Sequence, residues 1–104
     1  MGRIFSLIIV AATIVIGAVS ASAQSSTFEP NVDRPGSDYR SFNLSPGSPP
    51  QACQSACLSE PSCRAWTFVQ PGVQGDYPRC WLKGVVPQAQ GNPCCTSGII
   101  RRFN

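Results

Sequence analysis

Six cysteines are the most reactive side chains in this sequence, and no histidine accompanies them. They are Cys53, Cys57, Cys63, Cys80, Cys94 and Cys95. Structural zinc sites use closely spaced cysteine pairs, often together with histidine, and the spacings here do not fit that pattern. The CxxC motif of thiol-exchange proteins is also absent, and no histidine is present to activate a thiol. We therefore expect structural disulfides, with no metal site and no cofactor.

The remaining ionisable groups give little support to catalysis. The carboxylates are Glu29, Asp33, Asp38, Glu60 and Asp76. They are scattered and form no recognisable pair, and without histidine the commonest general base is missing. We expect a protein that is not an enzyme and has no catalytic residues, with Asp33 and Asp38 shaping the turn around Pro35 and Gly36.

Aromatic and basic side chains gather in the stretch Gln51–Lys83 and point to binding. Two segments, Cys63–Val69 and Arg79–Lys83, predict strands, the second running toward Val86. Side chains along a strand alternate between its two faces. If Cys63 and Cys80 point at a helix, the same alternation directs three more side chains toward it, those of Ala65, Thr67 and Leu82. The opposite face then carries Arg64, Trp66, Phe68, Trp81 and Lys83.

That opposite face is the candidate ligand-binding surface. Aromatic planes stack on sugars or pack against proteins, and neighbouring cations add hydrogen bonds or charge pairing. Tyr77, in the loop Gln70–Pro78, is a further candidate contact. The alternative is that the tryptophans belong to the core, covered by Tyr39, Phe42 or the last strand.

A helix is expected just before these strands. Ser48 can cap it, the following prolines suit its first turn, and Gln51 completes a capping box. Pro61 cannot continue a helix, so the predicted helix reaches about Ser59. Cys53 and Cys57 then leave one face side by side, an arrangement unsuited to a disulfide between them. Each is expected to reach a different strand.

Residues 1–23 are expected to be a secretory signal peptide. Arg3 is followed by a long apolar run, and Ala21 and Ala23 fit the small-residue cleavage rule near Ala23/Gln24. The run is shorter than a spanning helix prefers, so we expect no stable membrane insertion after cleavage. The mature chain would be secreted or periplasmic. Its net charge of about +2 calls for neither nucleic acid nor an anionic membrane as partner.

The mature part is expected to form one small domain at residues 31–104, after a flexible leader at residues 24–30. Asp38–Phe42 predicts a short strand and Pro87–Pro93 a loop. A last strand is expected at Ile99–Phe103, where an Arg101–Arg102 pair suits an exposed edge. A domain of this size normally requires disulfides to be stable.

The turn followed by DYRSF, the CxxxC helix, CRAWTF and CWLK together resemble a PAN/apple domain. The likeness covers about residues 31–100 and is closest to short bacterial members, which often end in paired cysteines. It implies an α+β fold, in which a curved antiparallel sheet cradles one helix. It also implies the disulfides Cys53–Cys80 and Cys57–Cys63.

Cys94 and Cys95 remain after that pairing, and the resemblance does not assign them. We expect a disulfide between the two, although adjacent cysteines form a tight ring when they bond. A different pairing of all six cysteines, or a bond to another chain, stays open.

Two classes of function follow. The first is an exported, non-enzymatic recognition module that binds a protein or a carbohydrate, as the resemblance to PAN/apple domains implies. The second is a structural protein of the cell envelope or of an assembly, in which the disulfides serve stability alone. A bond from Cys94 or Cys95 to another chain would favour the second class.

Overall fold

The computed structural model describes residue 2 and residues 24–103. The expected signal peptide, Met1–Ala23, therefore lies outside the described residues apart from Gly2, and its cleavage stays a prediction. Within residues 24–103, no helix has both the length and the apolar character needed to cross a membrane.

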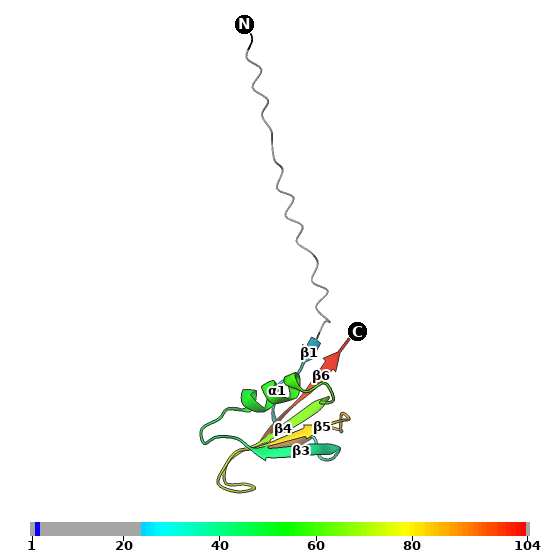
Figure 1. The fold of residues 1–104 in the computed structure, drawn as a ribbon. Helices are drawn as coiled ribbons and strands as arrows, with labels where there is room; N and C mark the ends of the chain where they lie inside the picture. Colours follow the sequence, from blue (N-terminus) through cyan, green and yellow to red (C-terminus); the bar gives the residue numbers. More distant parts are fainter. Residues whose placement is uncertain (1, 3–23, 104) are drawn as a thin grey trace.

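Six strands and one helix make up the described part of the chain. In order, they are β1 (Gln24–Ser26), β2 (Glu29–Asp33), β3 (Asp38–Asn43), α1 (Pro50–Ser59), β4 (Ala65–Val69), β5 (Arg79–Lys83) and β6 (Gln90–Arg102). The strands form one sheet in the order β1-β6-β4-β5-β3, and β2 also pairs with β6. Every pairing is antiparallel. The helix lies across one face (Figure 1), which confirms the predicted α+β architecture.

The helix begins and ends close to the predicted residues, but its start is built differently. Its N-cap is Pro49 and no side chain caps it, so the expected cap by Ser48 is wrong. The backbone N–H of Ser48 instead donates to the carbonyl of Ser45 in the preceding turn. Cys53 and Cys57 are its buried residues, as the one-sided spacing predicted.

The hydrophobic core lies between this helix and the sheet. Its largest fully buried side chains are Trp66 and Leu82, which are paired on the adjacent strands β4 and β5. The other buried members are Phe68, Ile100 and the four cysteines Cys53, Cys57, Cys63 and Cys80. Two disulfides, Cys53–Cys80 and Cys57–Cys63, cross-link this layer, in the pairing that the resemblance implies.

Two expectations about the chain ends are corrected. Gln24–Ser26 pairs with β6, and β2 begins at Glu29, so strands occupy the segment expected to be a flexible leader. The last strand begins at Gln90 rather than Ile99, because it pairs with three other strands along its length. The end of the expected loop Pro87–Pro93 is therefore part of β6.

The Arg101–Arg102 pair does not mark an exposed edge of the sheet. β6 lies inside the sheet, and both arginines are paired with β1. The guanidinium of Arg102 donates to carbonyls at the end of α1 and in the segment that follows. The acceptors are the backbone oxygens of Cys57, Leu58, Glu60 and Cys63. Its positive charge thus meets the negative end of the helix dipole.

Candidate functional site

The register of the sheet divides the predicted binding face between two sides. Trp66 is paired with Leu82 and Phe68 with Cys80, which places both aromatic residues on the helix side. Trp81 is paired with Thr67 on the other side of the sheet. The expectation that Trp66 and Phe68 share a face with Trp81 and Lys83 is therefore wrong.

The error comes from the residue at which the alternation was counted. Cys63 precedes β4 and lies in a turn, where its N–H donates to the carbonyl of Glu60 at 3.0 Å. Strand alternation holds only within regular strand. Counted from Ala65, where β4 starts, Ala65 and Thr67 face away from the helix.

Two of the residues predicted to contact a ligand are buried and cannot reach one. Trp66 is 0% exposed and Phe68 is 4% exposed, so both are core residues. This agrees with the alternative given for Trp66, because Ile100 of the last strand lies in the same core cluster. The ring of Phe28 also packs on Trp66, with ring centroids 5.8 Å apart. Tyr77 is 49% exposed on its loop.

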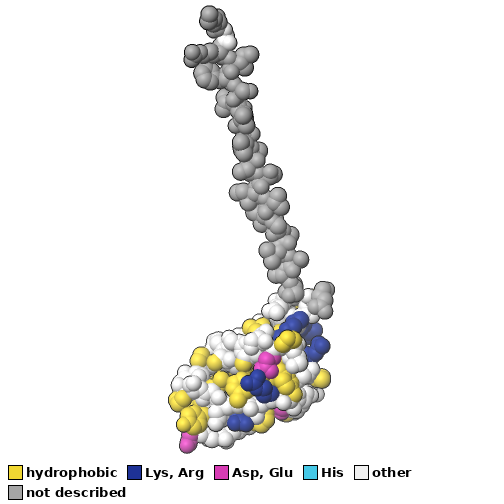
Figure 2. Space-filling model, viewed as in Figure 1, with side chains coloured by type: hydrophobic (Ala, Val, Ile, Leu, Met, Phe, Trp, Pro, Cys, Tyr) yellow, Lys and Arg dark blue, Asp and Glu magenta, His cyan; other side chains and the backbone are white. Residues whose placement is uncertain are grey.

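Arg64 is exposed at one end of the sheet, away from the helix–sheet core. It lines a shallow hollow there with Val86, Arg101 and Phe103. Figure 2 shows Lys and Arg side chains gathered at the end of the domain where β1 and β6 lie. Arg64 therefore belongs to this basic end rather than to the surface that contains Trp81.

A hollow with a volume of about 500 Å³ lies on the sheet face opposite the helix. We call it the sheet-face pocket. Side chains of β4 and β5 contribute Thr67, Val69, Trp81 and Lys83. Three other segments complete it, contributing Asp33, Pro35, Gly36 and Asp38, then Val73 and Gln74, then Asn92, Cys94 and Cys95. It therefore joins parts of the chain that are far apart in sequence.

The indole of Trp81 is held from two directions. Its Nε1–H donates to Oε1 of Gln74 at 2.9 Å. The guanidinium of Arg79 lies over the ring, 5.5 Å from its centroid, and is itself bonded to Ser41 and Asn43. An aromatic ring fixed in this way loses little further freedom when a ligand packs on it.

Lys83 is buried at the other end of the pocket, with 2% of its surface exposed. Its ammonium donates to Oδ1 of Asp38 at 2.5 Å and to the carbonyl of Gly36 at 3.2 Å. Gly36 has φ of +97°, a conformation that favours glycine. The lysine thus ties the β2–β3 turn to β5 and gives that wall of the pocket a fixed shape.

Three polar side chains of the pocket keep hydrogen-bonding capacity. Among the described residues, the carboxylate of Asp33 has no hydrogen-bond or ion-pair partner. Gln74 and Asn92 each use the amide oxygen, Gln74 toward Trp81 and Asn92 toward the backbone N–H of Cys94 at 3.1 Å. Their amide N–H₂ groups remain as donors.

Sequence reasoning missed Asp33, Gln74 and Asn92 as pocket residues. The sequence predicts Asp33 only as a turn former and Asn92 only as a loop residue. It marks the loop Gln70–Pro78 as a candidate contact surface, but through Tyr77 and not Gln74. Their spacing carries no local signal, because they meet only through the pairing of β6 with β2 and β4 and of β4 with β5.

Cys94 and Cys95 are bonded to each other on the pocket wall. Cys95 is buried and Cys94 is partly exposed. The backbone here is tied to the loop Gln70–Pro78, since the carbonyl of Cys94 accepts from the N–H of Gln70 at 3.1 Å. The side-chain amide of Gln70 donates to the carbonyl of Pro93 at 3.1 Å.

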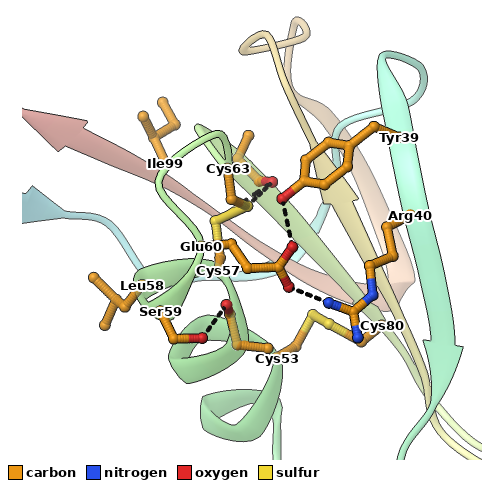
Figure 3. Close-up of a disulfide and its surroundings, with 12 residues drawn as sticks. Tyr39, Arg40, Cys53, Cys57, Leu58, Ser59, Glu60, Cys63, Cys80 and Ile99 are labelled. Carbon is orange, nitrogen blue, oxygen red and sulfur yellow. Dashed lines mark hydrogen bonds and ion pairs between the residues drawn. A yellow bond between two sulfur atoms is a disulfide. The ribbon is translucent and has the colours of Figure 1, made fainter.

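The helix side of the sheet carries a polar cluster. Figure 3 shows Tyr39 and Arg40 of β3 directed at Glu60, beside the Cys57–Cys63 and Cys53–Cys80 disulfides. The Tyr39 hydroxyl and the Arg40 guanidinium both bond to the Glu60 carboxylate, at 3.1 and 2.5 Å. Burial is the main cause that raises the pKa of Tyr39 above 10.0, and Glu60 acts in the same direction.

No group of three His, Cys, Asp or Glu side chains suited to a metal ion occurs within residues 24–103. The pocket offers a fixed aromatic ring, a buried ion pair and unpaired polar groups, which suits binding of a small polar group.

Comparison with known proteins gives one match. The family model for the PAN domain matches residues 32–83, which is half of the chain. No curated protein and no solved structure is significantly similar to the chain. The matched segment runs from the end of β2 through α1 to the end of β5. The chain therefore belongs to the PAN domain family.

Proposed function

We propose that this protein is an exported recognition module that binds a saccharide unit in the sheet-face pocket. PAN domains are typically binding modules for proteins or carbohydrates and not enzymes. The observation that carries the proposal is the fixed indole of Trp81 beside unpaired polar groups of Asp33, Gln74 and Asn92.

The chemistry of a sugar matches this set of groups. A sugar ring presents an apolar face of C–H groups, which packs well on an aromatic plane. Its hydroxyls both donate and accept hydrogen bonds, so they require acceptors such as the Asp33 carboxylate together with donors such as the two amides. A pocket with one aromatic surface and a few polar groups provides both.

Export is supported by the disulfides. Bonds such as Cys53–Cys80 and Cys57–Cys63 persist in oxidising compartments and are rare in the cytosol. The expected signal peptide at residues 1–23 would carry the chain to the periplasm or out of the cell.

No structural observation favours the structural-protein alternative. All six cysteines lie among the described residues and none of them is free. In this pairing no thiol remains for a bond to another chain. A protein ligand in the same pocket is one outcome of the test below.

The test is a glycan array probed with labelled, oxidised protein of residues 24–104. We expect binding to a defined group of saccharides and a loss of at least about tenfold in affinity for Trp81→Ala, which corresponds to about 1.4 kcal/mol. Tyr77→Ala is the matched control, because Tyr77 is aromatic, exposed and outside the pocket. Disulfide mapping and circular dichroism check that both variants fold.

Equal binding by the parent and by folded Trp81→Ala would refute the site. Loss of binding in Tyr77→Ala alone would place recognition on the loop Gln70–Pro78. If the array shows no binding while a protein captured from the cell envelope is lost with Trp81→Ala, the pocket is correct and the ligand is a protein.

A further inference from the structure

We propose that the Cys94–Cys95 disulfide is a site of reversible reduction by an external dithiol, and that reduction loosens the sheet-face pocket. The first part stands on the structure of the disulfide's surroundings alone. The second part rests on the proposed function, because it makes the redox state of the disulfide a control on ligand binding in that pocket.

The disulfides differ in how far a reductant can reach them. All four cysteines of the Cys53–Cys80 and Cys57–Cys63 bonds are 0% exposed beneath α1. Cys94 is partly exposed and lines the open pocket. Thiol–disulfide exchange requires a thiolate to reach a sulfur atom, so access selects the bond that reacts. A dithiol therefore meets Cys94–Cys95 first.

The exchange proceeds in two steps. A thiolate of the dithiol attacks Sγ of Cys94, and the Sγ of Cys95 leaves as a thiolate and takes up a proton. The second thiol of the reductant, as thiolate, then attacks its own sulfur in the mixed disulfide and releases Cys94, which is protonated in turn. Two electrons pass to the protein and the dithiol becomes a cyclic disulfide. The protein is the substrate here, so it needs no CxxC motif and no activating histidine.

Hydrogen bonds connect the backbone at the disulfide to the loop that holds Trp81. Asn92 accepts from the N–H of Cys94, and the carbonyl of Cys94 accepts from the N–H of Gln70. Gln70 begins the loop that carries Gln74 into the pocket, and Gln74 accepts from the indole of Trp81. The backbone around the disulfide thus supports the loop that holds the indole.

Reduction removes the covalent ring that restricts the backbone between residues 94 and 95. The two residues then gain rotational freedom. Forming the hydrogen bonds between the segment 92–94 and Gln70 therefore costs more conformational entropy than in the oxidised protein. We expect the loop to move more and the Gln74–Trp81 bond to be populated less. The indole of Trp66 is 0% exposed in the core and should not change.

The first experiment measures which disulfide opens. Oxidised protein of residues 24–104 is titrated with dithiothreitol, alkylated with N-ethylmaleimide and mapped by mass spectrometry. We expect alkylation of Cys94 and Cys95 at reductant concentrations that leave Cys53–Cys80 and Cys57–Cys63 intact. Reduction of either helix disulfide first, or of all three together, would overturn the assignment.

The second experiment measures the coupling without any ligand. In ¹⁵N–¹H spectra, the indole N–H of Trp81 should shift and exchange faster with water after selective reduction, and that of Trp66 should stay in place. The double variant Cys94→Ser/Cys95→Ser should resemble the reduced protein and should not respond to dithiothreitol. An unchanged Trp81 indole after complete reduction of Cys94–Cys95 would refute the coupling.

A third measurement separates this proposal from the proposed function. With any saccharide that the array identifies, we expect reduction to weaken binding by about tenfold or more and reoxidation to restore it. If binding depends on Trp81 but is equal in both redox states, the pocket stands and its redox control is wrong. If the glycan array shows no binding, the first two experiments still test this proposal, because neither requires a ligand.

Discussion

The indole of Trp66 lies against the backbone of Gly98, its partner on the neighbouring strand. A Cβ atom on residue 98 would lie 2.5 Å from Nε1 of Trp66 and would also collide with the carbonyl oxygen of Thr27. The Nε1 atom is buried and has no hydrogen-bond partner among the described residues. Gly98 is therefore what allows the largest core side chain to fit between α1 and β6.

We expect Gly98→Ala to destabilise the protein by about 3 kcal/mol, the upper end of what overpacking normally costs. Both obstacles are rigid, one being a buried ring and the other backbone. Gly91→Ala in the same strand is the control, since nothing lies within 4 Å of its Cβ position. Chemical denaturation measures the free energy of unfolding of both variants. Equal midpoints for the two variants would contradict the fit of Trp66 on Gly98.

The Lys83–Asp38 pair predicts a non-additive double variant. Asp38→Ala leaves the ammonium of Lys83, with 3% of its side chain exposed, without its charged partner. We expect a loss of about 3 kcal/mol in the free energy of unfolding. Lys83→Met in addition should recover much of that loss, because it removes the buried charge. A double-variant cycle by urea unfolding measures the coupling, and strict additivity would contradict it.

Arg102 and Arg101 are adjacent in sequence but should behave differently. Arg102 bonds to several carbonyls at the end of α1, and Arg101 is exposed with no such bond among the described residues. We expect Arg102→Gln to cost about 2 kcal/mol, as for hydrogen bonds from a charged donor. Arg101→Gln should stay within about 0.5 kcal/mol of the parent. Thermal unfolding measures the stability of the two variants. A larger loss of stability in Arg101→Gln than in Arg102→Gln would refute the role of Arg102 at the end of α1.

Tyr39 should titrate above the ordinary tyrosine pKa of 10.0. Burial raises its pKa most, and the hydrogen bond to Glu60 and its charge add to the effect, while Ser62 and Arg40 oppose it. A folded-state pKa above the unfolded value means that the neutral phenol stabilises the fold below pH 10. That contribution is lost as pH rises through the folded-state pKa.

Ultraviolet absorbance titration in a Tyr77→Phe background measures this pKa directly. The Tyr39 phenol should ionise above pH 10, and Glu60→Gln should move its pKa downward. A midpoint at or below 10 in the folded protein would show that the contacts around Glu60 do not hold the neutral form.

Several features could be predicted from the sequence because they depend on neighbouring residues. The helix end before Pro61 and the start of the strand at Arg79 follow from local spacing and composition, although that strand ends at Lys83 and does not run on toward Val86. The α+β fold and the PAN domain membership follow from motifs within one contiguous stretch, and the family model matches that same region.

The faces of β4 could not be predicted in this way. Alternation along a strand is reliable only once its first residue is known, and the turn at Cys63 moved that residue to Ala65. Cys63 lies outside regular strand, so its orientation toward the helix does not set the alternation within β4, and extending it along the strand placed Trp66 and Phe68 on the surface instead of in the core. Local residue types do not reveal such a shift, because aromatic residues suit either face of a strand.

The sequence by itself determined the helix, the strand at β5 and the family, since each depends on residues close together in the chain. Only the tertiary structure decided the sheet-face pocket. Asp33, Gln74, Trp81 and Asn92 lie on four separate segments, and they meet because the long β6 pairs with both β2 and β4 while β5 pairs with β4. Pairing between distant strands depends on packing throughout the domain, so no local pattern records it.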